Sequence, residues 1–215
     1  MPATTNGATP HLILREAARL FSVKGFHGTS TREIADAVGI RQPSLFHHFE
    51  SKAEIAKALL AYDYERSPGL RGEPDLPDAP PAVRLYQSVR REVLVEITSD
   101  YDLRGLYLSP LLEEPEFAPW KAAVARYLAQ TAEMIREGIR DGDFVDQDPG
   151  LVVDVFDAVI NQAVRWTPEQ HDPVKPDAVA GLVLRMVLKR PSRIPAIRAA
   201  ADRALRAAGI EWPVS

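Results

Sequence analysis

Apolar residues recur along this chain at the spacing of an α-helix, and this pattern is the strongest constraint on its fold. From Ala82 onward they return every three or four residues, and no stretch alternates with the period of two that a strand requires. Proline, glycine and capping residues end each run. The helices expected from this pattern lie at 82–98, 103–113, 117–140, 149–166, 176–189 and 195–208. The sequence therefore predicts an all-α protein.

The first sixty residues predict four shorter helices. The first begins at Thr9 and Pro10, a capping residue followed by the residue type favoured in a first turn, and it ends near Gly25. The second opens with a capping box formed by Ser30 and Glu33 and is only about two turns long. The third and fourth are expected to run from about 42 to 48 and from about 51 onward.

A proline-rich stretch divides the chain. The sequence RSPGLRGEPDLPDAPP contains five prolines and two glycines, too many for the interior of a helix. We therefore expect an exposed loop at 67–81. The prediction is a three-helix domain with a helix-turn-helix at 1–60, and an antiparallel helical bundle, which includes this loop, at 61–215.

Composition removes several classes of function. The 215 residues include no cysteine, which excludes disulfides, a thiolate nucleophile and a zinc site built on cysteine. No apolar run reaches the roughly 20 residues of a membrane span, and the N-terminus lacks the regions of a secretion signal, so we expect a cytoplasmic protein. The net charge of -4 divides into +2 for residues 10–60 and -6 for 61–215, so only the N-terminal segment is mildly basic.

Two of the N-terminal helices form a helix-turn-helix pattern, TREIADAVGIRQPSLF, with Gly39 in the turn. Ala35, Val38 and Leu45 are expected to fix the angle between these helices. Polar residues of the second helix are then free to face base edges in a DNA major groove. The same spacing occurs in other helical hairpins, so the alternative is a helical bundle that contacts proteins or a ligand without DNA.

The longer string AARLFSVKGFHGTSTREIADAVGIRQPSLFHHFESKAEI resembles the DNA-binding domain of the TetR, or tetracycline-repressor, family over residues 10–60. The matching positions are Ala17, Phe21, Gly25, Phe26, Thr29, Ile34, Ala35, Gly39, Leu45, Phe46, His48, Phe49 and Lys52. This resemblance implies a transcriptional regulator that binds DNA, with a C-terminal domain that dimerises and binds a small molecule. The rest of the chain resembles the family only in its length and helical character.

The resemblance also implies which residues read the bases. Gln42 and Ser44 lie at the start of the recognition helix, where the family contacts bases, and a glutamine can form two hydrogen bonds to adenine. Arg41 is expected to reach guanine or a phosphate. His47 lies where the family often places a groove or phosphate contact.

Further positions are implied to contact phosphates. Thr31, Arg32 and Lys52 lie at the N-termini of helices, where the helix dipole and the side chain act together on an anion. The chain departs from the family pattern at two positions. Arg41 replaces a capping serine or threonine, and Phe46 replaces a tyrosine, so one phosphate-directed hydroxyl is missing at this DNA-contact position.

No residue pattern indicates an enzyme or a metal centre. His47 and His48 are adjacent, so their side chains point about 100° apart on a helix, and no carboxylate lies at a ligand spacing. The aspartates of 141–148 lack the glycine and the final glutamate of a calcium loop. The motifs GxSxG and HExxH and a phosphate-binding glycine loop are absent. We expect no catalytic site, no metal and no cofactor.

The C-terminal domain supplies candidates for a ligand site and a dimer interface. The resemblance implies a cavity between helices, and the candidates to line it are Tyr107, Trp120, Tyr127, Phe156 and Asn161, with Arg104, Gln130 and Gln162 as further polar groups. The helices at 149–166 and 176–189 are apolar over much of their surfaces and are expected to join two copies. The predicted mechanism is repression by a dimer with recognition helices about 34–36 Å apart on a palindromic operator, and a small molecule alters that separation.

Overall fold

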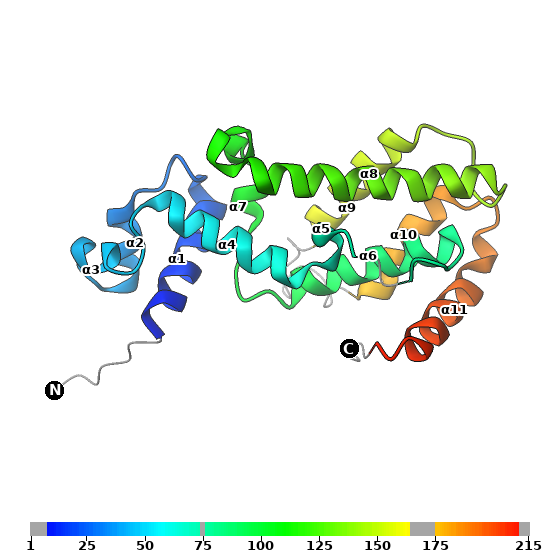
Figure 1. Cartoon of the computed structure of the whole chain (residues 1–215), viewed down its shortest axis with the longest axis horizontal. Coiled ribbons are helices and arrows are strands. Elements are labelled where there is room, and N and C mark those ends of the chain that lie inside the picture. The colour runs from blue at the N-terminus through cyan, green and yellow to red at the C-terminus, as the bar shows by residue number, and fades with distance from the viewer. Residues whose placement is uncertain (1–7, 74–75, 164–174, 211–215) are drawn as a thin grey trace. The chain divides into compact units, whose positions relative to one another are not determined.

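The computed structural model describes residues 8–73, 76–163 and 175–210 (Figure 1). Within these ranges the chain forms eleven α-helices and three short 3-10 helices, and its one extended pairing is an antiparallel bridge between Phe144 and Leu188. The all-α expectation is confirmed. None of the described helices is both long and apolar enough to cross a membrane. The chain divides into an N-terminal unit, Met1–Arg66 with Ser99–Ala122, and a C-terminal unit, Ser67–Thr98 with Ala123–Ser215.

The N-terminal unit combines the first four helices with a later segment of the chain. Its elements are α1 (Ala8–Lys24), α2 (Thr31–Val38), α3 (Gln42–Phe46), α4 (Lys52–Arg66), α7 (Arg104–Tyr107), η1 (Pro110–Glu113) and η2 (Pro115–Phe117). They enclose one apolar core, in which Phe21, Leu45 and Phe117 are completely buried. The later segment therefore completes the hydrophobic core of the first four helices.

The contact between α1 and α7 is unusually close because Gly105 has no side chain. A Cβ atom at this position would lie 2.2 Å from the carbonyl carbon and oxygen of Phe21, far inside van der Waals contact. Ser22 joins the two segments further: its hydroxyl donates to the Asp102 carbonyl at 3.1 Å and accepts from the Gly105 amide at 3.3 Å. The backbone of α7 is thus held directly against the backbone of α1.

The C-terminal unit is a helical bundle with a separate core. Its elements are α5 (Pro68–Arg71), α6 (Pro81–Ile97), α8 (Ala118–Arg140, from residue 123), α9 (Pro149–Ala163), α10 (Pro176–Val187), η3 (Pro191–Arg193) and α11 (Ile194–Ala207). Helix α6 packs along α10 and α11. The core includes Tyr86, Phe144 and Phe156, each at most 1% exposed, and the Tyr86 hydroxyl donates to Asp177 at 2.7 Å.

Three details of the predicted organisation differ from the structure. The stretch 67–81 is not entirely loop, because the Ser67 hydroxyl caps the short helix α5 and Pro68 fits its first turn. The predicted helix 103–113 is interrupted, because Pro110 starts a separate 3-10 turn after α7. The division predicted at residue 60 falls inside α4, which continues to Arg66.

Candidate nucleic-acid interface and ligand cavity

Local hydrogen bonds build the turn between α2 and α3. The Ser30 hydroxyl accepts from the Glu33 amide at 3.2 Å, and the Glu33 carboxylate accepts from the Ser30 amide at 2.8 Å, which confirms the predicted capping box. Gly39 ends α2 with a φ of 77°, a left-handed conformation that favours glycine. The Ile40 amide then donates to the Ala35 carbonyl at 3.0 Å and closes the turn.

One buried residue anchors α3 and leaves its other side chains outside. Leu45 is completely buried, whereas Ser44, Phe46 and His47 are exposed. Phe46 presents a large apolar ring that is 43% exposed. Arg41 precedes the helix with extended backbone and makes no side-chain capping bond, as its residue type predicts. The short helix therefore displays a mixed polar and aromatic surface.

Gln42 is oriented by the preceding helix. Its amide nitrogen Nε2 donates to the Thr31 hydroxyl at 2.8 Å. A glutamine amide can form several hydrogen bonds, so this bond orients the Gln42 side chain and still leaves the amide able to bind other partners. Arg32 is the one cation of α2: its side chain is 81% exposed and lies 4.0 Å from Asp36, the outer limit of an ion pair. Such a pair leaves the guanidinium able to reach an external anion.

Lys52 has two partners inside the protein. Its ammonium donates to the carbonyls of Phe26 at 2.6 Å and Thr29 at 2.7 Å and lies 4.3 Å from the centre of the Phe26 ring. Burial lowers the pKa of Lys52, and the nearby carboxylates of Glu114 and Glu33 oppose this effect. The ammonium therefore ties the loop between α1 and α2 to the start of α4.

The negative charge of Glu33, at the start of α2, is offset by a neighbouring lysine. Lys24 lies 2.5 Å from Glu33, and this hydrogen bond, followed by those from Ser30, lowers the pKa of Glu33 to about 2. Glu33 is therefore ionised at neutral pH. The adjacent Lys24 charge reduces its repulsion of a phosphate at this helix terminus.

The C-terminal unit contains a cavity of about 260 Å³ between α5, α6 and α8. Its lining residues are Gly69, Glu73, Leu76, Arg84, Gln87, Ser88, Arg91, Tyr127, Gln130, Thr131, Glu133, Met134 and Glu137. Several of the polar groups are deeply buried: Gln87 is 1% exposed, Arg91 6% and Thr131 0%. In small-molecule sites, such fixed polar groups orient the ligand and provide specificity.

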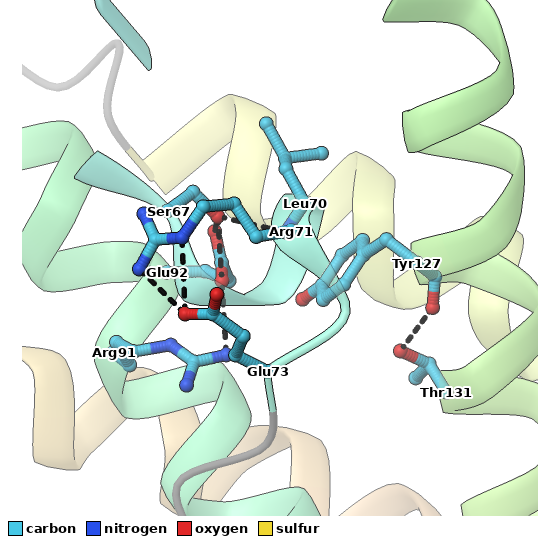
Figure 2. A network of polar contacts seen from close by, with 8 residues as sticks. All are labelled: Ser67, Leu70, Arg71, Glu73, Arg91, Glu92, Tyr127 and Thr131. Atoms are coloured by element: carbon cyan, nitrogen blue, oxygen red, sulfur yellow. Dashed lines mark hydrogen bonds and ion pairs between the residues drawn. The ribbon is translucent and has the colours of Figure 1, made fainter. Parts of the chain in front are cut away.

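Ion pairs and hydrogen bonds surround the end of the cavity near α5 (Figure 2). Arg71 pairs with Glu73 at 2.8 Å, Arg91 lies 3.5 Å from Glu92, and the Ser67 hydroxyl donates to the same Glu92 carboxylate. Figure 2 shows the Tyr127 ring reaching from α8 towards this group of side chains. These contacts connect α5 and α6 on one side of the cavity.

The ligand candidates taken from sequence lie in different places. Tyr127 and Gln130 line the cavity. Tyr107 belongs to the N-terminal unit, where its hydroxyl donates to Asp63, and Trp120 packs beside Phe117 in the same unit. Phe156 is 1% exposed in the C-terminal core. Two further candidates, Asn161 and Gln162, have side chains outside the described part of the structure.

The polar wall supplied by α6 was missed at the sequence level. Arg84, Gln87, Ser88 and Arg91 occupy relative positions 0, 3, 4 and 7 of α6. That spacing places them on one face. The 0, 3, 4, 7 spacing of these polar residues is the signal that pointed to the wall, but further charged residues on the same helix, such as Arg90 and Glu96, obscure it.

Helices α9 and α10 expose apolar side chains. Four of the nine large apolar side chains that are exposed in the described part of the chain lie on these two helices: Leu151, Val155, Leu182 and Met186. Other apolar residues of the same helices, such as Val152 and Val183, are buried in the core of their own unit. The two helices therefore present a partly apolar surface in addition to their core face.

Comparisons with known proteins match the N-terminal segment. The model of the family described as bacterial regulatory proteins, tetR family, matches residues 13–59. The HTH-type transcriptional repressor KstR2 of Mycobacterium tuberculosis is 46% identical over 48 residues, which are 22% of this chain and 24% of KstR2. The matched region is thus about a quarter of that relative's length.

Solved structures resemble the whole chain. The crystal structure of Mycobacterium smegmatis AmtR has a TM-score of 0.68 and 27% identity, with 99% of this chain and all of that chain covered. The crystal structure of AibR in complex with isovaleryl coenzyme A and operator DNA has a TM-score of 0.66 and 22% identity, covering 83% of this chain and 97% of that chain. The second likeness concerns the fold alone.

Proposed function

We propose that this chain is a transcriptional regulator of the TetR family, and that it is a cytoplasmic, dimeric repressor released from a palindromic operator by a small molecule. The observation that carries this proposal is the α2–α3 hairpin. Its angle is fixed by a capping box, a left-handed glycine and buried Leu45, while the outer surface of α3 remains exposed. A rigid hairpin with a free outer surface has the properties required for reading a major groove.

We assign base reading to α3 and phosphate contacts to the start of α2. Gln42, directed by its bond to Thr31, offers its amide to an adenine edge, while Ser44 and Arg41 flank it. The exposed Phe46 ring suits apolar contact with a thymine methyl group. His47 remains an expected groove or phosphate contact.

Arg32 and Thr31 are proposed to contact phosphates. Arg32 is open to solvent, and Thr31 begins α2, where backbone amides also favour an anion. For Lys52 we propose a role other than the phosphate contact that its position in the sequence suggested. Because its ammonium bonds to two carbonyls of the loop before α2, we propose that it supports DNA binding by positioning that loop.

The dimer is proposed to form through α9 and α10. Leu151, Val155, Leu182 and Met186 are apolar and exposed, and exposed apolar side chains gathered on two helices are typical of a protein interface. A second copy presents the same residues, so a two-fold interface would bury them mutually. The dimer would set the separation of its two α3 helices at about 34–36 Å, one turn of DNA.

The cavity is proposed as the ligand site. KstR2, which matches the N-terminal segment, is a repressor, and the AibR crystal structure contains both isovaleryl coenzyme A and operator DNA. These relatives support a regulator whose DNA binding responds to a small molecule. The ligand can shift this protein between states only by the difference between its affinities for them.

Selection of bound duplexes from a random library, with the full chain at near-physiological salt and competitor DNA, tests this function. We expect a palindrome with half-sites about one helical turn apart. In a parallel selection Gln42→Ala should lose preference at one base pair of each half-site and keep it elsewhere. A folded, dimeric chain that enriches no sequence, with or without small molecules added, would contradict the proposed function.

A further inference from the structure

The cavity between α6 and α8 has two chemically different ends. Arg84 of α6 pairs with Glu137 of α8 at one end. Ser88 and Arg91 lie one to two turns after Arg84 on α6. They face Tyr127, which lies about three turns before Glu137 on α8. The two helices therefore run antiparallel along the cavity, with Met134 between its ends.

Each carboxylate on the cavity wall already has an arginine partner. Glu73 pairs with Arg71, Glu137 with Arg84, and Glu133 lies 3.0 Å from both Arg136 and Arg140. A cationic ligand would have to compete with these arginines for the carboxylates. The wall is therefore poorly suited to an ammonium group.

Hydrogen-bond donors gather at the Tyr127 end. The Tyr127 hydroxyl is buried, and although the neighbouring Ser88 hydroxyl acts to lower its pKa, it forms no well-aligned hydrogen bond with a described residue. Burial and the adjacent Glu92 charge raise the pKa of Tyr127, so the hydroxyl keeps its proton at neutral pH. Arg91, 6% exposed, adds a guanidinium to the same wall. A buried hydroxyl without a well-aligned partner is costly, and a ligand oxygen would remove that cost.

Contacts with the backbone hold the Tyr127 ring in place. A Cβ atom at Gly69 would lie 2.9 Å from the ring and 2.7 Å from a Glu92 oxygen, so the glycine allows the ring to lie directly against α5. The Thr131 hydroxyl donates to the Tyr127 carbonyl at 3.0 Å. The hydroxyl of Tyr127 is thus presented from a fixed position (Figure 2).

The size of the cavity limits the ligand. Its volume of about 260 Å³ lies just below the usual range for drug-sized ligands, roughly 300–1,000 Å³. The wall of α6 from Arg84 to Arg91 is seven residues long, or about 10 Å at the helical rise. Leu76 and Met134 add apolar surface to the lining. The space suits a small molecule with one polar head and a short apolar body.

We propose that this cavity binds a small monocarboxylic acid, whose carboxylate accepts hydrogen bonds from Tyr127 and Arg91 while its apolar body lies along Met134. The inference deepens the proposed function, because it names the class of effector for the same cavity. Carboxylate recognition by an arginine and a hydroxyl uses charge-assisted hydrogen bonds, which are stronger than neutral ones.

Calorimetric titration of the full chain with hexanoate, hexanamide and hexylamine tests the proposal, since these probes share one apolar chain and differ in the head. Hexanoate should bind about tenfold or more tightly than hexanamide, and hexylamine should not bind. Tyr127→Phe should weaken hexanoate binding about tenfold, because one bond to a charged group is lost. Its urea midpoint should stay close to that of the wild type, because the hydroxyl makes no more than a poorly aligned contact with Ser88 within the described part of the chain.

Tyr107→Phe is the matched control, since it removes a tyrosine hydroxyl in the other unit, and it should leave hexanoate affinity unchanged. The proposal is overturned if hexanamide or hexylamine binds as tightly as hexanoate, if none of the probes binds, or if Tyr127→Phe binds hexanoate normally. Titration needs no DNA. Failure here, with a palindrome still enriched from the library, would therefore reject the ligand class and leave the DNA-binding function standing.

Discussion

Replacing Lys52 by methionine separates a role in folding from a direct contact with DNA. The substitution keeps most of the aliphatic side chain and removes two hydrogen bonds, at 2.6 and 2.7 Å, to the carbonyls of Phe26 and Thr29. Bonds to a charged group contribute about 1.5–3 kcal/mol each. Because Lys52 is only half-buried and water can replace the ammonium at the carbonyls, we expect a net loss of about 2 kcal/mol in unfolding free energy.

Urea unfolding and the salt dependence of DNA binding give the two readouts for Lys52→Met. The slope of log affinity against log salt should stay at the wild-type value, because no phosphate contact is lost. Lys57→Met removes the same charge from ion pairs with Glu54 and Glu116 and should change stability by less than about 1 kcal/mol. Arg32→Ala should reduce the slope by about 1 at unchanged stability. Unchanged stability of Lys52→Met, with a slope reduced by about 1, would refute the positioning role.

Three further substitutions test the packing. Gly105→Ala forces a Cβ against the backbone of α1 and should cost about 1–3 kcal/mol or more in urea unfolding, whereas Gly150→Ala, whose nearest neighbour is a side-chain oxygen at 3.3 Å, should change stability by less than about 1 kcal/mol. Equal effects of the two would contradict the close α1–α7 contact. Leu182→Asp, at a side chain that is 53% exposed, should give folded monomers in light scattering, whereas Val183→Asp, at one that is 1% exposed, should prevent folding. A dimeric Leu182→Asp would move the interface elsewhere. Burial raises the pKa of Asp63, so the folded state holds the carboxyl proton more tightly than the unfolded state does. The free energy of unfolding therefore falls as the pH rises from 3.8 through the pKa of Asp63 in the folded state. Asp63→Asn should lack this fall in urea midpoints measured from acid to neutral pH, and an identical pH profile in both proteins would exclude Asp63 as its source.

Features set by neighbours in sequence were predictable. The capping box of Ser30 and Glu33, the turn at Gly39 and the inward position of Leu45 depend on residues within one or two helical turns, and the structure has all three. The surface position of His48 was not predictable in this way: its imidazole is exposed. A five-residue helix anchored by one leucine leaves too little core to cover the imidazole.

The ligand cavity was harder to predict, because its walls come from separate parts of the chain. Tyr107 and Tyr127 are both tyrosines next to apolar residues, yet one completes the N-terminal core and the other lines the cavity. No local pattern distinguishes them. Helix α10 presents a similar problem: Leu182 and Val183 are adjacent apolar residues, and only packing against α6 decides which is buried.

The measurement that tests DNA reading by the α2–α3 hairpin most directly is hydrogen–deuterium exchange of the full chain with and without the duplex enriched from the library. Backbone amides that become covered by DNA exchange more slowly. We expect slower exchange at 31–38 and 42–46 when the duplex is bound. Tight binding of the duplex with unchanged exchange in both helices, and protection elsewhere in the chain, would contradict it.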